Sequence, residues 1–467
     1  MENKKKQGTI ILICILAGAG LIGAIVIAGA FLLQKNPLAA GLAGLAEEVN
    51  AWEAELGENF WTDAVNQIGN GNMQAEYSFN IGGIPTLQNM TVGVDGKIKR
   101  DMEQQLFETD LRVSVTNAAI AEASVSGTEN TIYLQVPSIW DGSVIFKPEN
   151  VNGQWNNSAA RKQLQLLTGQ ELGIDQRIDM KMLESFSVEP FSAAGFFREH
   201  AEELKNLYKN METVKVEKAK KEGMLSEEQA ESLTGYVLED AEGNAIETTC
   251  YLVILPEKEL GDILKNVTGD IKLAVYLDQE KRIVRISTLP GGGWVTDSGE
   301  RELALNLTGE AATIDRLELT ISGVLDADKL GLEELGYISG KVEAEADYII
   351  VKEPDEKGTY DIECEMFLAG QNDTLEFSAK GSIQGERLET GEKLSLNAEN
   401  LTVRSQDAVL CRCSGNILYE PLEGNIKMPS GKEYRIGEMG EIETMLFLAG
   451  CAENVYKNYS GYLKMLR

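Results

Sequence analysis

An uncharged apolar run from Thr9 to Leu33 constrains this chain more than any other feature of its sequence. About 20 apolar residues are enough to cross roughly 30 Å of hydrocarbon, and this run is longer. Lys4, Lys5 and Lys6 precede it, whereas only Lys35 follows it before Lys97. Because lysines favour the cytoplasmic side, the sequence predicts a short cytoplasmic tail over 1–8 and a single transmembrane helix over 9–33.

A cleaved secretory signal is the alternative interpretation of the same run, with Ala28-Gly29-Ala30 as its cleavage site. Signal peptides have apolar regions of about 7–15 residues, which this run exceeds. The prediction is therefore an uncut anchor, and the predicted location is the cell membrane, with the N-terminus cytoplasmic and the bulk extracytoplasmic. A tail over 1–8 is too short to form a domain, which argues against a receptor with its own cytoplasmic output.

The charge balance restricts the partners of the rest of the chain. Lysines and arginines number 43 and acidic residues 74, which gives a net charge of −31. A body this acidic repels phosphate backbones and anionic headgroups, so nucleic acid is excluded as a partner.

Changes in hydrophobic period divide the chain beyond the anchor into three regions. Residues 37–149 start with helical spacing and continue with period-two alternation, which predicts a helix followed by an antiparallel meander. Residues 150–235 are mainly helical, and Ser226-Glu-Glu-Gln is typical of a helix start. Residues 236–467 alternate again and end in a helix from Met439 to Leu466. The predicted fold class is α+β, with curved antiparallel sheets wrapped on amphipathic helices behind the single N-terminal transmembrane helix.

One stretch, residues 249–287, is similar to a known family. Its sequence is TCYLVILPEKELGDILKNVTGDIKLAVYLDQEKRIVRIS, which contains a strand ending at Pro256, a short helix from Glu259 to Asn266 and two further strands joined by Asp278-Gln-Glu-Lys281. This arrangement resembles the half-barrel lipoprotein carriers of the LolA and LppX type and their uncharacterised Gram-positive relatives. The resemblance implies a curved sheet around an apolar cavity that holds acyl chains. This chain departs from the family in its greater length, its lack of a lipobox and its 150–235 insertion.

Alternation places apolar side chains on one face of two neighbouring strands in this stretch and of one strand in the first meander. If the sheet curves around a groove, these side chains line it, and an acyl chain there is stabilised by about 0.8 kcal/mol per methylene. The predicted ligand-lining residues are Tyr77, Phe79, Tyr251, Val253, Leu273 and Val275. The alternative is a plain core in which helices cover the same faces.

Residues typical of catalytic and metal sites are scarce. His200 is the only histidine and lies at core-facing helical spacing, so a structural role is predicted for it. No catalytic residue, metal site or cofactor is predicted. The cysteines beyond the anchor are Cys250, Cys364, Cys411, Cys413 and Cys451. Because their number is odd, at least one free thiol is predicted.

The sequence therefore predicts a bacterial membrane-anchored extracytoplasmic binding protein, not an enzyme, that holds a lipid or other amphipathic ligand in a half-barrel groove. Its predicted partners are the membrane, through residues 9–33, a lipid or amphipathic small molecule, and an envelope protein or wall polymer. Two alternatives stay open. One is a non-enzymatic structural or assembly protein of the cell envelope, and the other is an unrecognised carboxylate-based hydrolase.

Overall fold

The computed structural model describes most of the chain beyond its N-terminal part. The described residues are 55–465 with gaps at 58–59, 85–89, 117, 129, 171–172, 174–200, 241–242, 261–268, 290–293, 297–298, 309–314, 327–339, 354–355, 371–373 and 407. The predicted tail and membrane helix, residues 1–33, and His200 lie outside these residues. Among the helices that are described, none has both the length and the apolar character needed to cross a membrane.

The chain forms two compact units. Unit 1 contains residues 1–62, 190–385 and 398–412, and unit 2 contains residues 63–189, 386–397 and 413–467. Each unit is built on antiparallel strands.

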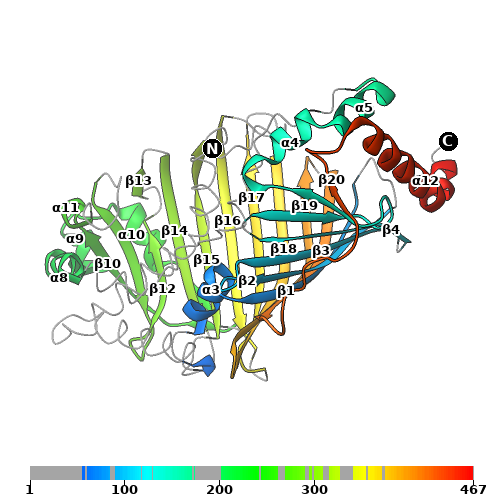
Figure 1. Ribbon diagram of the computed structural model, residues 1–467. Helices are drawn as coiled ribbons and strands as arrows, with labels where there is room; N and C mark the ends of the chain where they lie inside the picture. Colours follow the sequence, from blue (N-terminus) through cyan, green and yellow to red (C-terminus); the bar gives the residue numbers. More distant parts are fainter. Residues whose placement is uncertain are drawn as a thin grey trace. The chain divides into compact units, whose positions relative to one another are not determined.

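The strands of unit 1 form a continuous antiparallel meander (Figure 1). Each strand pairs with the next in this order: β7 (Glu212–Lys215), β10 (Thr249–Leu255), β11 (Ile271–Leu277), β12 (Ile283–Thr288), β14 (Gly299–Thr308), β15 (Arg316–Asp326), β16 (Lys341–Lys352), β17 (Thr359–Ala369) and β18 (Thr374–Leu388). The short strand β13 (Trp294–Thr296) pairs with β14, and β8 (Leu238–Glu239) pairs with β9 (Ala245–Ile246). The long strands β18, β19 (Gly391–Ser405) and β20 (Ala408–Pro421) contribute residues to both units.

Short helices cover both faces of the sheet at β10 and β11. They are α8 (Ala201–Asn210), α9 (Val216–Lys221), α10 (Glu227–Thr234) and α11 (Glu257–Leu260). On one face, Leu207 of α8 and Leu260 of α11 pack into a cluster with Val253. On the other face, Leu252 packs with residues of α9 and α10. A strand buried on both faces is apolar at consecutive positions, which explains the uninterrupted apolar runs of β10 and β11.

The start of α10 follows the sequence prediction. The Ser226 hydroxyl accepts a hydrogen bond from the Gln229 backbone N–H at 3.1 Å, and the Gln229 side chain accepts one from the Ser226 N–H at 3.1 Å. Together these bonds satisfy two N–H groups that a helix start otherwise leaves without partners. The predicted helix start at Ser226 is confirmed.

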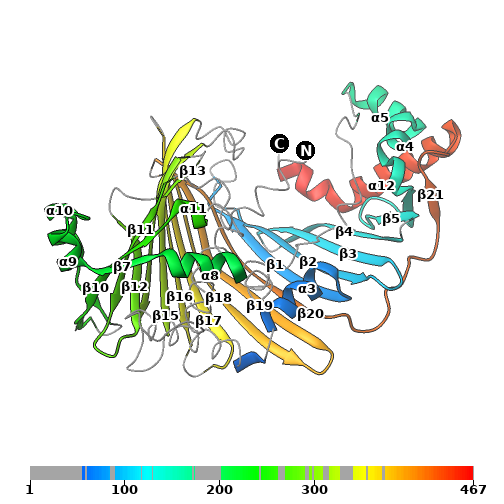
Figure 2. The same ribbon diagram turned by 90° about the vertical axis from the view of Figure 1, so that its left-hand side faces the viewer.

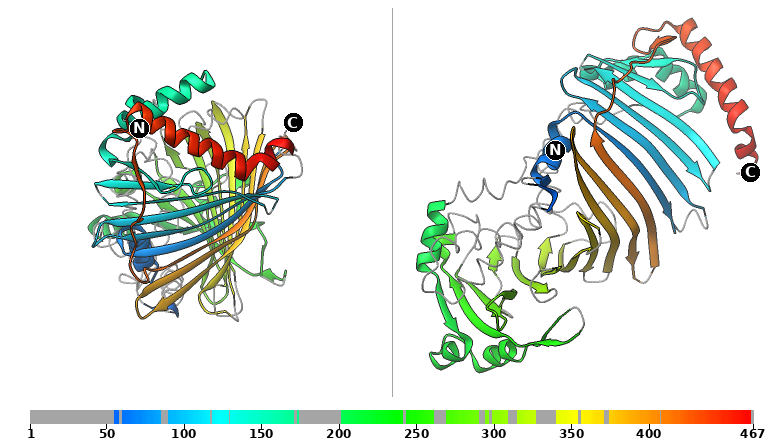
Figure 3. Two further views of the ribbon diagram at one scale, coloured as in Figure 1. Left: turned by 45° about the vertical axis from the view of Figure 1, so that its right-hand side comes forward. Right: turned by 90° about the horizontal axis from the view of Figure 1, so that it is seen from below.

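Unit 2 is a second meander, and Figure 2 labels its strands β1 to β5 and β21. Consecutive antiparallel strands are β1 (Met73–Gly82), β2 (Val92–Asp101), β3 (Leu106–Val115), β4 (Ala118–Thr128), β5 (Thr131–Gln135) and β6 (Ser143–Phe146), and β21 (Glu433–Arg435) pairs in parallel with β6. Its helical elements are η2 (Pro148–Asn150), α4 (Val151–Asn157), α5 (Ala159–Thr168) and α12 (Glu441–Met465), together with the part of α3 (Phe60–Asn70) that follows Thr62. Helix α12 packs against α5 (Figure 3).

The predicted α+β fold class is wrong, because the described residues are mostly β. Strands β18 and β19 each have 15 residues, whereas α8 has 10 and α11 has 4. Long hairpins satisfy the backbone groups of this chain strand to strand, so the sheets are not wrapped on a layer of helices. Several local predictions are confirmed nonetheless, namely the strand that ends before Pro256 (β10), the two strands joined by Asp278-Gln-Glu-Lys281 (β11 and β12) and the C-terminal helix (α12).

Candidate functional site

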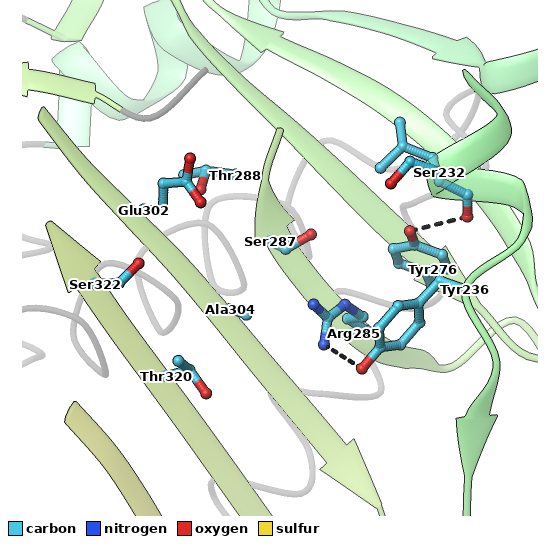
Figure 4. A pocket seen from close by; sticks show the side chains of 11 residues that line it. Ser232, Tyr236, Tyr276, Arg285, Ser287, Thr288, Glu302, Ala304, Thr320 and Ser322 are labelled. Atoms are coloured by element: carbon cyan, nitrogen blue, oxygen red, sulfur yellow. Dashed lines mark hydrogen bonds between the residues drawn. The ribbon is translucent and has the colours of Figure 1, made fainter. Parts of the chain in front are cut away.

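A polar pocket opens in unit 1 between the end of α10 and strands β11, β12, β14 and β15 (Figure 4). Its volume is about 170 Å³. The described residues that line it are mostly polar, and seven of them carry hydroxyl groups: Ser232, Tyr236, Tyr276, Ser287, Thr288, Thr320 and Ser322. Arg285, Glu302, Ala304 and Leu233 complete the described lining. We call this site the β12 pocket.

A bulge in β12 explains why Arg285 faces the pocket. Arg285 lies opposite Tyr276, whereas Ile283 lies opposite Leu277, so Val284 is an additional residue in the ladder. Ile283 packs into the α8 side of the sheet, and Val284 packs into the α10 side. Strict alternation would then return Arg285 to the α8 side, but a bulge breaks the alternation and re-aims the following side chain. The bulge therefore brings the guanidinium to the α10 side.

Tyr236, just after α10, holds Arg285 in place. An Arg285 Nη1–H donates to the Tyr236 hydroxyl at 2.9 Å, and the guanidinium carbon lies 4.0 Å from the Tyr236 ring centroid. The Tyr236 ring is tilted against the Tyr276 ring, with centroids 5.9 Å apart. The Tyr276 hydroxyl in turn donates to the Leu233 carbonyl oxygen of α10 at 3.0 Å. Stacking and hydrogen bonding together fix the planar group, so a ligand meets a preoriented set of donors.

Small side chains create the space beside Arg285. Ser287 of β12 lies opposite Ala304 of β14, and Ala304 lies opposite Thr320 of β15. Ala274 of β11, opposite Ser287, is completely buried. A row of Ala, Ser and Thr across adjacent strands leaves a hollow that larger residues would fill.

Glu302 lies further along β14 from Arg285. Its register partner is Ser322 of β15, and Figure 4 shows its carboxylate near Thr288, away from Arg285. The pocket therefore has a cationic group and an anionic group at separate places, with Ser287 between them.

The lining consists mainly of side chains that form hydrogen bonds. The lining residues described above include neither histidine nor lysine. Over the described parts of both units, no three His, Cys, Asp or Glu residues converge as metal ligands.

Cys250 lies beside this site and is predicted to be chemically inert. Burial raises the pKa of its thiol to about 12. Relative to a pKa of 9.0, this leaves about a thousandfold less thiolate at pH 8, and the thiolate is the reactive form. We expect native-state alkylation at pH 8, read by peptide mass spectrometry, to leave Cys250 unlabelled while unfolded protein is labelled fully. Equal labelling in both states would contradict the raised pKa of this half-buried thiol.

All five cysteines that the structure describes are free, which confirms the prediction of at least one free thiol. No disulfide links Cys411 or Cys413 to Cys364 or Cys451.

Four of the six predicted ligand-lining residues belong to one buried cluster. Tyr251, Val253, Leu273 and Val275 are at most 8% exposed. They pack with Leu207 of α8, among other apolar side chains. Helices cover this face, as in the plain-core alternative, and the four residues point away from the β12 pocket.

The other two, Tyr77 and Phe79, belong to unit 2 and cover glycines. Tyr77 lies opposite Gly96 of β2, where a Cβ would collide with the Tyr77 ring. Phe79 lies against Gly415 of β20, at 2.6 Å from the position of a Cβ there. An aromatic ring above a strand glycine protects backbone that has no side chain of its own. The structure therefore does not bring these two residues together with the other four.

Sequence reasoning missed the residues of the β12 pocket. The available signal was Arg285, a charged residue within the otherwise apolar strand around Ile283 and Ile286. Tyr236 gave no signal, because it contacts Arg285 through the packing of a helix on a sheet 49 residues away.

Comparisons with known proteins give only distant structural likenesses. No family model matches the sequence, and no curated protein matches it. Among solved structures, OpdQ of Pseudomonas aeruginosa is 6% identical, with a TM-score of 0.20, over 74% of this chain and 96% of that chain. The outer membrane protein opdK of the same organism is 6% identical, with a TM-score of 0.15, over 75% and 97%. A triple mutant of the Rhodopseudomonas blastica porin is 6% identical, with a TM-score of 0.15, over 75% and 99%.

These comparisons correct the predicted family. The matched structures include a porin and an outer membrane protein and no half-barrel lipoprotein carrier is among those named above, so the predicted resemblance to the LolA and LppX type is wrong. The function predicted from this resemblance, that of a membrane-anchored protein that holds lipid in a half-barrel groove, is therefore also wrong. The predicted single-pass extracytoplasmic location is corrected on the same finding. At these TM-scores, nothing about the activity of this chain is taken from those proteins.

Proposed function

We propose that this protein binds a small polar molecule in the β12 pocket without transforming it chemically. The observation that carries the proposal is the fixed guanidinium of Arg285, stacked 4.0 Å from the Tyr236 ring at the edge of a hydroxyl-rich hollow. Binding sites of this kind use a few well-placed polar groups to orient the ligand.

The burial of the lining supports a binding role. Ser287 is only 6% exposed and yet lines the pocket with its hydroxyl group. Polar groups in such a position favour a ligand that hydrogen-bonds to them. The pocket also lies on the sheet of unit 1 near its most buried strands, and a rigid scaffold preserves the geometry of a site.

Filling the pocket tests the proposal. Ala304→Leu places a branched side chain into the hollow between Ser287 and Thr320. We expect it to weaken binding of small polar molecules at least about tenfold, with its unfolding midpoint lowered only slightly because the hollow has room for it. The measurement is calorimetric titration of the purified full-length chain with a panel of neutral, anionic, cationic and zwitterionic small molecules.

The matched control is Ala119→Leu, at an exposed strand position of β4 in unit 2. It should bind as the unsubstituted protein does. If no member of the panel binds the folded chain at millimolar concentration, or if Ala304→Leu binds as well as Ala119→Leu, the β12 pocket is not a binding site.

A further inference from the structure

We infer that the ligand of the β12 pocket is an uncharged polyhydroxyl compound of about the size of one sugar ring. This inference rests on the proposed function and specifies the chemical class of the ligand.

The charges in the pocket disfavour a ligand with a net charge. Arg285 and Glu302 contribute one positive and one negative group, at separate places in the lining. An anion that contacts Arg285 is repelled by the carboxylate of Glu302, and a cation that contacts Glu302 is repelled by the guanidinium of Arg285. The net charge of −31 on the whole chain further lowers the local concentration of small anions.

The spacing of the two charges also disfavours an α-amino acid. Arg285 lies opposite Asn306, and Glu302 is four residues away along β14. Four strand residues separate their backbones by about 13 Å, and their charged groups lie at separate places in the lining, whereas the ammonium and carboxylate of an α-amino acid are joined through one carbon atom. A ligand that hydrogen-bonds to both Arg285 and Glu302 therefore carries polar groups along its length.

Hydroxyl groups match this lining because each can donate and accept. Seven of the described lining residues carry hydroxyls, and a hydroxyl offers one donor and two acceptor positions. The Arg285 guanidinium carries five N–H donors, one of which donates to Tyr236, and carboxylate oxygens such as those of Glu302 accept hydrogen bonds from hydroxyl groups. Adjacent hydroxyls of a sugar or sugar alcohol satisfy both groups without adding charge.

The size of the pocket restricts the ligand to one ring. Its volume of about 170 Å³ is below the roughly 300–1,000 Å³ of pockets that hold drug-sized molecules. Tyr276 and Leu233 add an apolar surface on the α10 side, where the ring carbons of a sugar lose their contact with water.

Calorimetric titration of the full-length chain with defined probes tests the inference. The neutral probes are D-glucose, D-galactose, D-xylose and sorbitol; the charged probes are serine, glycylglycine, lactate and citrate. We expect at least one neutral probe to bind at least about tenfold more tightly than every charged probe. Arg285→Gln, Glu302→Gln and Ala304→Leu should each weaken it at least about tenfold, while Arg112→Gln in β3 of unit 2 leaves it unchanged.

Glu302→Gln separates the ligand classes. It removes a carboxylate that repels anions, so an anionic ligand would bind this variant more tightly than the unsubstituted protein, and a neutral ligand would bind it less tightly. If only charged probes bind, and Ala304→Leu abolishes their binding, the ligand class is wrong and the proposed function stands. If none of the eight probes binds, both this inference and the proposed function fail.

Discussion

Replacing Arg100 with methionine is expected to lower the free energy of unfolding by about 3 kcal/mol. The Arg100 guanidinium lies at the C-terminal end of α3 and donates to three carbonyl oxygens, those of Ile68 at 2.7 Å, Gly71 at 3.1 Å and Gln67 at 3.3 Å. The last carbonyls of a helix have few partners within it, so these bonds add donors at the end of α3, where the Gln67 carbonyl also accepts from the Gly71 N–H at 3.0 Å. Methionine keeps much of the length of the side chain and removes every donor.

Arg112→Met is the matched control for Arg100→Met. The Arg112 side chain is 57% exposed and pairs with Glu122 at 3.6 Å. An exposed pair of this kind contributes about 0–1 kcal/mol, so urea denaturation should give the control nearly the midpoint of the unsubstituted protein. Equal midpoints for the two methionine variants would show that Arg100 does not stabilise the end of α3. Burial also lowers the pKa of Arg100, but arginine stays protonated throughout the accessible pH range, so its contribution should not titrate between pH 5 and 9.

Gly96→Val is expected to destabilise the protein by about 3 kcal/mol, although valine ordinarily favours a strand over glycine. A Cβ at Gly96 would collide with the Asp110 carbonyl oxygen of β3 and with the Tyr77 ring. The Tyr77 hydroxyl donates to that same carbonyl at 3.2 Å, so the ring cannot move away without losing this bond.

Gly82→Val at the end of β1 is the control for Gly96→Val. A Cβ at Gly82 would have only the Thr91 hydroxyl nearby, at 3.7 Å, which is an ordinary contact. Its unfolding midpoint should stay the same or rise, because valine has the higher strand propensity. A Gly96→Val variant as stable as Gly82→Val would contradict the packing of Tyr77 over β2.

Local elements of unit 1 could be predicted because their signals are local. The uninterrupted apolar runs of β10 and β11 are bounded by turn residues, and the Ser226 capping box lies within four residues. The fold formed by the long hairpins was harder to predict. Alternation of apolar and polar residues indicates a strand, but it does not show how many strands join in one sheet or which elements cover that sheet. The α+β fold class was predicted because the amphipathic segments were expected to form a larger part of the core than they do in the structure.

The candidate site could not be predicted, because it depends on a departure from alternation. Period two turns Arg285 toward the α8 side, together with Ile283, and only the bulge at Val284 reverses it. Strand register decides where a bulge forms, and register is a property of the pair of strands rather than of one sequence segment. The predicted row of Tyr251 and Val275 was located on one face correctly, but sequence does not show that α8 and α11 cover that face.

The most direct test of a ligand site in the β12 pocket is a crystal structure of the full-length chain with the tightest-binding probe from the titrations. We expect difference density for the probe between Arg285 and Ser322, with an oxygen atom of the ligand within hydrogen-bond distance of the Arg285 guanidinium. Arg285 should keep its contact with the Tyr236 ring, because the donor set is already oriented in the unbound protein. Density for the probe elsewhere on the chain, with the β12 pocket empty at saturating concentration, would contradict the account.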